Sequence, residues 1–374
     1  MFKVNTLYET LSQHYQKQLP FVVYSRPINN VIKCWLQKNI NIYNTTDFSE
    51  SGFVFTPFDI EQTSILFPIE QCDFRSIEVS PNKSNIQNHC AKKTQVNDVE
   101  KQQHLNLIEK GLNAIQQNQF NKVVLSRSEF LPLEKINPIE LFKRLFHKYH
   151  KAMVYCWYHP KIGLWLGATP ELLFKTEGQE LTTISLAGTQ LAENNKAPQW
   201  TAKELEEQQI VTDYLVQQTR DLTLKTKISE TESVKAGQLW HLKTYIKSRL
   251  KLGVNLKDII KTLHPTPAVC GFPKQVSKAF ILNQENHNRE FYTGFLGELN
   301  LKSTIKRNSN RKNIEQNAYD LIQKNSNFYV NLRCLQIKNE QAIIYVGGGI
   351  TKDSIPEKEW EETLNKSKVM KDIL

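Results

Sequence analysis

Lys122 has the residue type and the setting of a general base. It opens the run Lys-Val-Val-Leu-Ser-Arg, whose β-branched residues predict a strand with Lys122, Val124 and Ser126 on one face. An amine at the start of a buried strand can lose its proton, because burial lowers the pKa of a lysine. The alternative is a lysine at the sheet edge that extends its ammonium group into water.

Glu171 is the matching candidate for a general acid. It follows a strand that we expect to end at Gly167, and it lies between Pro170 and the apolar run Leu-Leu-Phe. Such neighbours raise the pKa of a carboxyl, which then holds its proton as a general acid must. The alternative is a glutamate in the first turn of a helix that is capped by Thr169.

Glu207 is a candidate metal ligand on a predicted helix over 202–222. It precedes Ile210 and Val211 by three and four residues, so it shares their apolar face. An acid on a buried face needs a cation, and a metal ion is one solution.

Glu362 is a second candidate ligand, on a predicted C-terminal helix over 357–373. Glu362 and Lys366 lie four residues apart on one stripe of that helix. Two inward glutamates on two helices suit Mg²⁺, which takes one or two carboxylates together with substrate oxygens and water. The alternative for Glu362 and Lys366 is an ordinary surface ion pair.

Arg333 and three successive glycines could bind an anion. They belong to a predicted hairpin over 328–350, whose return strand we expect to end at Gly347–Gly349. The guanidinium of Arg333 offers a bidentate fork for a carboxylate, and glycine N–H groups can converge on an anion. No Lys-Ser/Thr follows, so this is no phosphate loop, and a flexible turn is the alternative. In the first strand of this hairpin, alternation places Arg333 on one face and Phe328, Val330, Leu332 and Cys334 on the opposite face.

The run Leu263–Pro273 contains three prolines and a glycine, which exclude a regular helix or strand. Because it also contains Leu263, Ala268, Val269 and Phe272, we expect it to pass through the interior as a stiff pocket wall. The alternative is a surface turn between two helices.

Composition places the chain among globular proteins of the cytoplasm. Its 374 residues are 40% hydrophobic, and its 6 cysteines show no CxxC pair or regular spacing, so we expect reduced thiols rather than disulfides or a zinc site. No apolar run reaches the 18 residues of a membrane helix, and the first residues lack a signal-peptide core. We therefore expect a cytoplasmic protein that does not bind a membrane.

The net charge of +10 does not predict nucleic-acid binding, because basic residues are spread among 38 acidic ones. The densest basic segment, 301–326, holds Tyr319 as its one aromatic residue, which equips it poorly to stack on bases. We expect a solvated, mobile loop there. The positive field favours an anionic small substrate.

Taken in order, these segments resemble the chorismate-utilising enzymes, and within them the isochorismate synthases. The resemblance covers residues 120–370, about two-thirds of the chain. The matching segments are Lys122–Arg127, Gly167–Leu173, Leu186–Thr189, Lys203–Glu207, Leu239–Leu242, Leu263–Pro273, Arg289–Gly294, Leu332–Cys334, Tyr345–Ile350 and Glu359–Lys366.

The resemblance implies an α/β (α+β mixed) fold of two stacked mixed β-sheets with helices outside. It implies one catalytic domain over 1–374, in which 1–100 is a variable N-terminal part and 101–374 is the chorismate-binding core. It further implies a monomer that needs no amidotransferase subunit, with the site in the cleft between the halves.

The resemblance also assigns roles to residues. Lys122 matches the base that activates water for attack at C2 of chorismate, which favours the first interpretation of this lysine. Glu171 matches the acid that protonates the departing C4 hydroxyl, and Glu207 and Glu362 match the two Mg²⁺ ligands. Contacts to the substrate carboxylates are assigned to Arg333, Gly348, Gly349 and Lys366, and further pocket positions to Thr189 and His241.

Two positions distinguish the reactions of this family. Ammonia-dependent relatives usually carry glutamine in place of Lys122, and they and the salicylate synthases usually carry threonine in place of Ala268. The resemblance therefore implies an Mg²⁺-dependent isomerase that converts chorismate to isochorismate, for menaquinone or siderophore synthesis. The alternatives are a salicylate synthase, which goes on to eliminate pyruvate, and a non-catalytic chorismate-binding homologue. One departure is Gln208, where the family usually has histidine.

Overall fold

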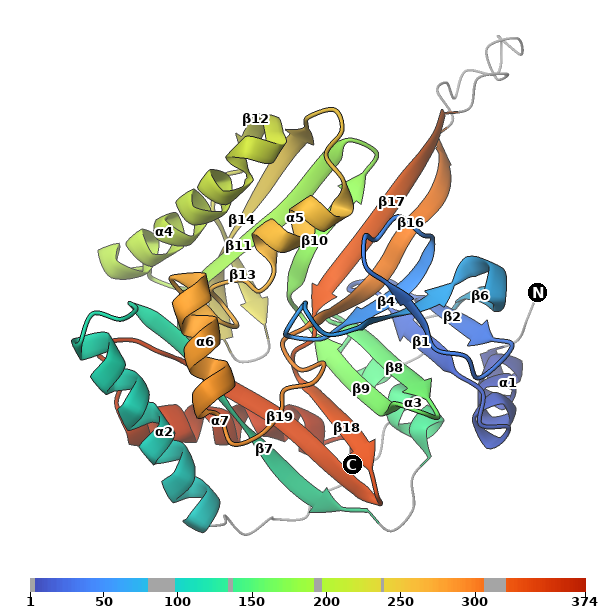
Figure 1. Ribbon diagram of the computed structural model, residues 1–374, viewed down its shortest axis with the longest axis horizontal. Coiled ribbons are helices and arrows are strands. Elements are labelled where there is room, and N and C mark those ends of the chain that lie inside the picture. The colour runs from blue at the N-terminus through green and yellow to red at the C-terminus, as the bar shows by residue number, and fades with distance from the viewer. Residues whose placement is uncertain (1–3, 80–97, 134–136, 192–196, 237–238, 306–320) are drawn as a thin grey trace.

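Two antiparallel sheets form the framework of the protein (Figure 1). The computed structural model describes residues 4–79, 98–133, 137–191, 197–236, 239–305 and 321–374. In the order of the first sheet, its strands are β15 (Gly271–Phe272), β7 (Lys122–Pro132), β19 (Gln341–Ile350), β18 (Cys334–Lys338), β9 (Gly163–Thr169), β8 (Met153–His159), β1 (Phe21–Ser25), β2 (Val31–Gln37) and β6 (Cys72–Glu78).

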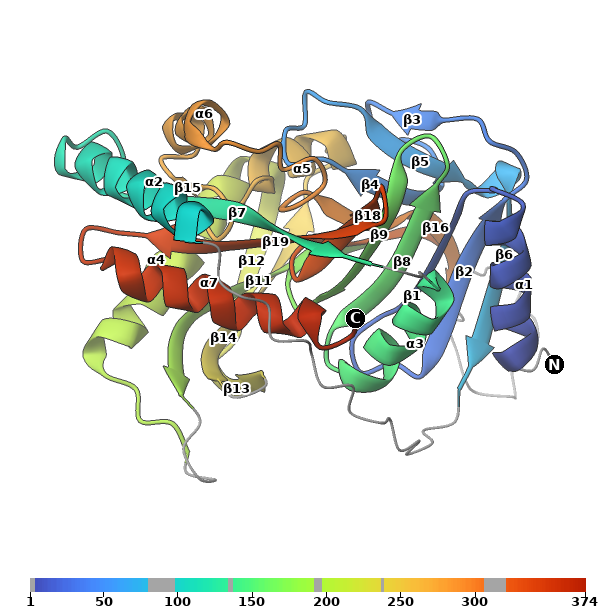
Figure 2. The ribbon, with the colours of Figure 1, turned by 90° about the horizontal axis from the view of Figure 1, so that it is seen from below.

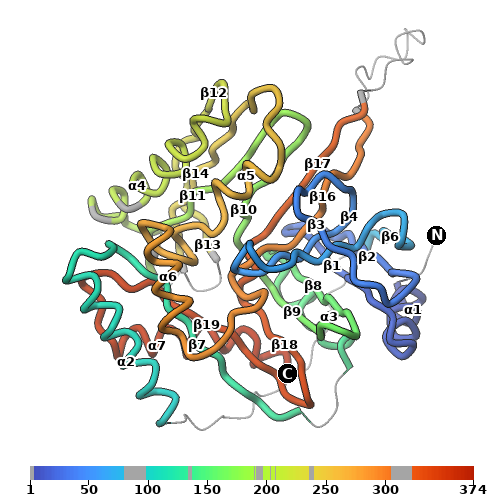
Figure 3. Tube along the Cα trace, in the orientation of Figure 1, coloured from blue at the N-terminus to red at the C-terminus, as the bar shows by residue number. Residues whose placement is uncertain are grey.

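Among the described residues, the second sheet has as many strands along its path as the first and one further strand off the path. In spatial order its strands are β12 (Thr223–Ile228), β14 (Leu239–Leu250), β11 (Glu180–Leu191), β10 (Leu172–Glu177), β17 (Leu321–Val330), β16 (Phe295–Ile305), β4 (Gly52–Thr56), β5 (Ser64–Pro68) and β3 (Tyr43–Thr45), with β13 (Glu232–Ala236) paired to β14. In the tube trace, the blue N-terminal strands lie on the opposite side of the molecule from α4 (Ala202–Thr219) (Figure 3).

Helices cover the outer faces of both sheets. α1 (Val4–Gln16) and α3 (Pro138–Lys148) pack on the first sheet around β1, β8 and β9, whereas α4 packs on β11 and β14 of the second. α5 (Leu256–Leu263) packs against α4, and α2 (Asp98–Gln116) packs against α7 (Pro356–Lys371). Figure 2 shows α6 (Lys274–Gln284) and α7 on opposite sides of strands β7 and β19.

The strand β8 shows how the layers are built. All seven of its residues are buried, which excludes a strand with one face in water. Val154, Cys156 and Tyr158 pack under α1 and α3, whereas Tyr155 and Trp157 face the second sheet. The expected pair of stacked sheets with helices outside is therefore confirmed, and its described strand pairs are antiparallel.

Aromatic rings fill the space between the two sheets. Phe55 of β4 stacks on Phe291 with 4.2 Å between ring centres, and Trp165 of β9 stacks on Tyr345 of β19 at 5.4 Å. Large aromatic side chains contribute most of the buried apolar area in such a layer. This core holds the ends of β9, β18 and β19 next to the second sheet.

The predicted hairpin over 328–350 is wrong in its first half. Phe328 and Val330 belong to β17 of the second sheet, whereas Cys334 belongs to β18 of the first. Residues 328–334 are therefore not one continuous strand of a hairpin. Arg333 sits at the crossing with a left-handed φ of 47°. Both sheets bury apolar residues here, so alternation alone did not reveal where one strand ends and the next begins.

Part of the basic segment 301–326 is strand rather than a mobile loop. Lys302 of β16 pairs with Lys324 of β17 in an antiparallel ladder, and residues 306–320 lie outside the described part. The described cysteines are buried free thiols, as expected: Cys34, Cys72, Cys156, Cys270 and Cys334. Cys90 lies outside the described residues. Among those residues, no helix is long and apolar enough to cross a membrane.

Candidate active site

The side chain of Lys122 lies next to Gly349 of the neighbouring strand. β7 pairs with β19 so that Val124 is opposite Gly349, and the Lys122 carbonyl accepts a hydrogen bond from Ser277 Oγ at 3.0 Å. A Cβ atom at Gly349 would lie 3.0 Å from Lys122 Cε and 3.6 Å from its Nζ. The missing side chain at Gly349 therefore makes room for the lysine stem and places its amine over β19.

Glu171 lies in the short connection between β9 and β10. Its N–H donates to Thr169 Oγ1 at 3.3 Å, and its carbonyl accepts from the Val330 N–H at 3.0 Å. The alternative of a capped helix start is wrong, because β10 follows directly.

Burial raises the pKa of Glu171 to about 7, as its apolar neighbours predicted. The positive charges of Lys122, Arg333 and Lys366 oppose this rise in pKa. These three side chains therefore lie in the same region as the Glu171 carboxyl. A carboxyl that titrates near neutral pH, beside several cations, can deliver a proton to an anionic substrate.

Arg333 is a partly buried cation at the crossing between the sheets. Burial lowers the pKa of its guanidinium, and Tyr292, Glu362 and Glu171 oppose that effect. Its carbonyl accepts from the Ala168 N–H at 3.0 Å. Its guanidinium makes no hydrogen bond or ion pair with another described residue, so its N–H groups can pair with a ligand carboxylate.

The helix α7 brings two carboxylates and an ammonium to the glycine strand. Lys366 Nζ lies 2.6 Å from Glu362 Oε1 and donates to the Gly347 carbonyl at 2.8 Å. The Cβ position of Gly348 is 3.3 Å from Glu359 Oε2 and 3.9 Å from Glu362 Oε2. The ion pair of the alternative interpretation exists, but Lys366 also binds the sheet, which an ordinary surface pair would not do.

Glu359 is a site residue that our sequence analysis did not single out. Burial raises the pKa of its carboxyl, and the negative charge of Glu362 adds to that rise. The signal was present in the spacing, because residues three apart on a helix share a face. The carboxylates of Glu359 and Glu362 lie beside Lys366 and offer neighbouring oxygen ligands of the kind that Mg²⁺ takes. Among the described residues, no three His, Cys, Asp or Glu side chains gather as a metal cluster.

The glycines Gly347–Gly349 are strand residues and not a flexible turn. They lie within β19 and pair with Ser126, Leu125 and Val124 of β7 in that order. The predicted return strand therefore continues through the glycines instead of ending before them.

His241 lies on β14 opposite Thr189 of β11. Its Nδ1 is 3.1 Å from the Gly188 carbonyl, and burial lowers the pKa of the ring, helped by the charge of Arg333. The side chain of Thr189 lies outside the described part of the structure. So does the side chain of Glu207, which α4 carries, and its predicted metal contact stays a prediction.

The predicted apolar face of α4 is wrong at Ile210, which is 60% exposed. The face that packs on the second sheet includes Gln208, whose Nε2 donates to Thr244 Oγ1 at 2.8 Å and to the Ser185 carbonyl at 3.2 Å. Thr212 also binds Ser185, at 3.1 Å between their hydroxyl oxygens. Leu215 is buried, and Val211 and Tyr214 pack against the same core, so the predicted face is confirmed at these three positions. Hydrophobic periodicity did not show that polar residues extend this face.

The stiff run after α5 is buried only in part. Leu263 and Val269 are buried as expected, but Ala268 is exposed and Phe272 is 41% exposed. The Phe272 ring meets Tyr214 of α4 edge-on, with 5.6 Å between centres. Phe272 therefore packs against α4 at the surface of the protein and not in the core, although it is apolar.

The comparisons with known proteins agree with this geometry. The family described as chorismate binding enzyme matches residues 61–304, and a second model of that description matches residues 320–372. The chain belongs to the chorismate-binding enzyme family.

Several members of the chorismate-binding enzyme family resemble the chain in sequence. It is 29% identical over 291 residues to isochorismate synthase DhbC of Bacillus subtilis, covering 72% of this chain and 67% of that protein. It is 28% identical over 278 residues to isochorismate synthase MenF of Pasteurella multocida, covering 70% and 58%. The match thus spans between about half and two-thirds of these relatives.

Two solved structures of chorismate-binding enzymes share the fold. The putative 2,3-dihydroxybenzoate-specific isochorismate synthase DhbC of Bacillus anthracis superposes with a TM-score of 0.75 at 20% identity, covering 98% of this chain and 99% of that one. The menaquinone-specific isochorismate synthase MenF of Escherichia coli gives 0.75 at 20% identity, covering 95% and 88%.

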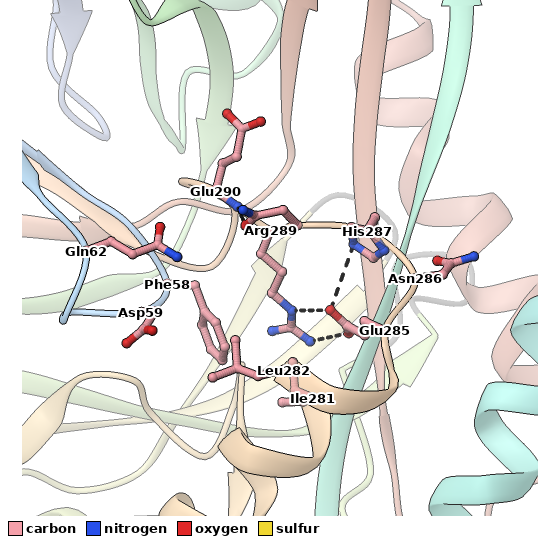
Figure 4. Close-up of a pocket in the computed structure, with 11 residues that line it drawn as sticks. Phe58, Asp59, Gln62, Ile281, Leu282, Glu285, Asn286, His287, Arg289 and Glu290 are labelled. Atoms are coloured by element: carbon pink, nitrogen blue, oxygen red, sulfur yellow. Dashed lines mark hydrogen bonds and ion pairs between the residues drawn. The ribbon is translucent and has the colours of Figure 1, made fainter.

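A cavity of about 410 Å³ lies beside β7 in this chorismate-binding enzyme, but the predicted catalytic residues do not line it (Figure 4). Its wall includes the buried pair Glu285–Arg289, whose oxygen and nitrogen approach to 2.6 Å. Every N–H of the Arg289 guanidinium is used, because it also donates to the carbonyls of Val124 and Val269 and to Thr293 Oγ1. The cavity wall therefore supports the strand that carries Lys122.

Proposed function

We propose that the protein is an Mg²⁺-dependent isochorismate synthase. The observation that carries the proposal is the carboxyl of Glu171, whose pKa is about 7 among the charges of Lys122, Arg333 and Lys366. A dianionic substrate suits a region with three cations, and an acid that is partly protonated at neutral pH suits the loss of a hydroxyl. The names of the curated relatives support the same activity.

Binding and orientation of chorismate are assigned to α7, β18 and β19. Arg333 and Lys366 neutralise the substrate carboxylates, and Gly348 and Gly349 let the substrate approach the backbone of β19. Thr189, His241 and Ala268 complete the pocket by resemblance. Mg²⁺, held by Glu362 with Glu359 beside it and by Glu207 from α4, would supply positive charge at the ring carboxylate.

Lys122 and Glu171 divide the proton transfers between them. Lys122 Nζ, as the neutral amine, removes a proton from water as the water oxygen bonds to C2 of chorismate. The ring double bonds shift, and the C4–oxygen bond breaks as Glu171 protonates the leaving hydroxyl. One water enters and one leaves, so the reaction is an isomerisation and runs in both directions.

Product analysis of the purified protein with chorismate and Mg²⁺ tests the proposal. Isochorismate as sole product supports it, whereas salicylate with pyruvate indicates a salicylate synthase. Absence of turnover with intact chorismate binding indicates a non-catalytic homologue. Cytoplasmic localisation, a monomeric state and the absence of an amidotransferase subunit stay predictions. Sedimentation analysis checks the monomeric state. The solved relatives are named as 2,3-dihydroxybenzoate-specific and as menaquinone-specific, so siderophore and menaquinone synthesis both stay candidate pathways.

A further inference from the structure

Arg127 is a buried cation that joins β7 to α7. It is 6% exposed, and its Nε donates to Thr363 Oγ1 at 2.9 Å. Its guanidinium carbon lies 4.4 Å from the centre of the Trp360 ring, within the range of a cation–π contact. Glu129, two residues along the strand, holds the other side of the guanidinium at 3.4 Å and pairs with Lys371 of α7.

These contacts fix the rotation of α7 about its own axis. Trp360 and Thr363 are buried and contact Arg127 of β7, and each is one residue after a carboxylate of the site, Glu359 or Glu362. Because one residue turns a helix by about 100°, a small rotation at Thr363 would carry Glu362 away from Gly348. The hydroxyl of Thr363 also donates to the Trp360 carbonyl at 2.8 Å, so the Arg127 contact is tied to the helix backbone.

Arg127 also connects the metal side of the site to the base. It lies five residues along β7 from Lys122, a distance of about 16 Å in an extended strand. It pairs with Val346 of β19, next to the Gly347 whose carbonyl binds Lys366. One strand therefore carries both the base and the anchor of the helix that bears Glu362 and Lys366.

We propose that Arg127 is a positioning residue that sets the rotation of α7 and thereby the metal site at Glu359 and Glu362. The inference rests on the proposed function and extends it to a residue that touches neither substrate nor metal. Loss of a group that orients metal ligands typically weakens metal affinity about 10–100-fold.

The decisive comparison is between Thr363→Val and Thr363→Ser. Valine has nearly the volume of threonine but cannot accept the hydrogen bond from Arg127, whereas serine keeps the hydroxyl. Mg²⁺ affinity of the free protein, measured by titration calorimetry, should fall at least tenfold in Thr363→Val and in Arg127→Gln. Thr363→Ser should stay within about threefold of the wild type, and Lys368→Gln, an exposed change on the same helix, should leave affinity unchanged.

Thermal unfolding of the same variants separates positioning from simple stability. Mg²⁺ affinity within twofold of the wild type in Thr363→Val would overturn the proposal, even if the melting temperature falls. If Arg127→Gln does not fold, the valine and serine pair decides alone. A wild type that binds Mg²⁺ but makes no isochorismate would refute the proposed function and leave the role of Arg127 standing. A wild type that binds no Mg²⁺ would overturn both.

Discussion

The side chain of Lys122 packs against the backbone of Gly349, because Lys122 Cε lies 3.0 Å from the position that a Cβ atom of residue 349 would take. The two residues lie more than two hundred positions apart in the chain and on neighbouring strands. The position of the proposed base therefore depends on a residue that has no side chain of its own.

Gly349→Ala should displace Lys122 and lower kcat/KM at least tenfold. The new methyl group would occupy the path of the lysine stem, and misplacing a reacting group by about 1 Å can cost a hundredfold in rate. Gly348→Ala is the matched comparison on the same strand, because its Cβ would meet the Glu359 carboxylate at 3.3 Å rather than Lys122, and its loss should be smaller. Steady-state kinetics with chorismate checks both, and equal losses would contradict the assignment.

The pH profile should report the carboxyl of Glu171. Because the proposed acid must be protonated and its pKa is about 7, kcat/KM should fall about tenfold per pH unit well above that value. Glu171→Gln should reduce turnover at least a hundredfold and leave substrate binding intact. Near-normal turnover in that variant would remove Glu171 from the mechanism.

Glu171→Gln should also stabilise the protein at alkaline pH. The folded pKa of about 7 lies above the ordinary 4.5, so the stabilising contribution is fully present below about pH 4.5 and is lost as the pH rises through about 7. The amide has no charge to bury, so the gain at pH 8 should reach at most about 3 kcal/mol. Urea unfolding at pH 5 and pH 8 measures it, and an equal effect at both values would contradict this origin.

Chelation of divalent ions should abolish turnover, and added Mg²⁺ should restore it. Glu359→Gln and Glu362→Gln should each weaken Mg²⁺ affinity at least tenfold, since both carboxylates face Gly348. Glu361→Gln is the control, because this exposed side chain on the same helix is not among those within 4 Å of the Gly348 Cβ position, which are Glu359 and Glu362. An effect of Glu362→Gln alone would show that Glu359 is not part of the metal site.

Arg289→Ala should be the most destabilising change in the cavity wall. It leaves the carboxylate of Glu285 buried without its cation, which typically costs about 3–5 kcal/mol. Arg249→Ala, at an exposed position of β14, should change the free energy of unfolding by less than about 0.5 kcal/mol. Chemical denaturation compares the two, and similar values would contradict the importance of the buried pair.

Sequence patterns identified the strand and helix that carry the proposed base and metal ligand. The run at Lys122 is β-branched and the helix at Glu362 begins with proline, and both features are local. The contact of Lys122 with Gly349 is not local, because it depends on which strands become neighbours. Glu171 shows the same division, since its apolar neighbours predicted the raised pKa but not the cations gathered from three other elements.

The predictions that were wrong depend on contacts or strand boundaries that local sequence patterns do not show. α4 packs through Gln208 and Thr212, whose hydrogen bonds to the sheet no hydrophobic pattern can reveal. The crossing at Arg333 was hidden because successive residues are buried on both sides of it, at the end of β17 and through most of β18. Glu359 was visible in the spacing but gained meaning only when Gly348 was found beside it.

The left-handed backbone of Arg333 makes this one position serve two purposes that conflict. For an arginine, such a conformation costs about 1–2 kcal/mol, and glycine would adopt it freely. Glycine would, however, remove the guanidinium that the substrate carboxylate is proposed to meet. The protein thus keeps a residue that folding disfavours at the place where the chain crosses between sheets, and a search for more stable variants would tend to select against its function.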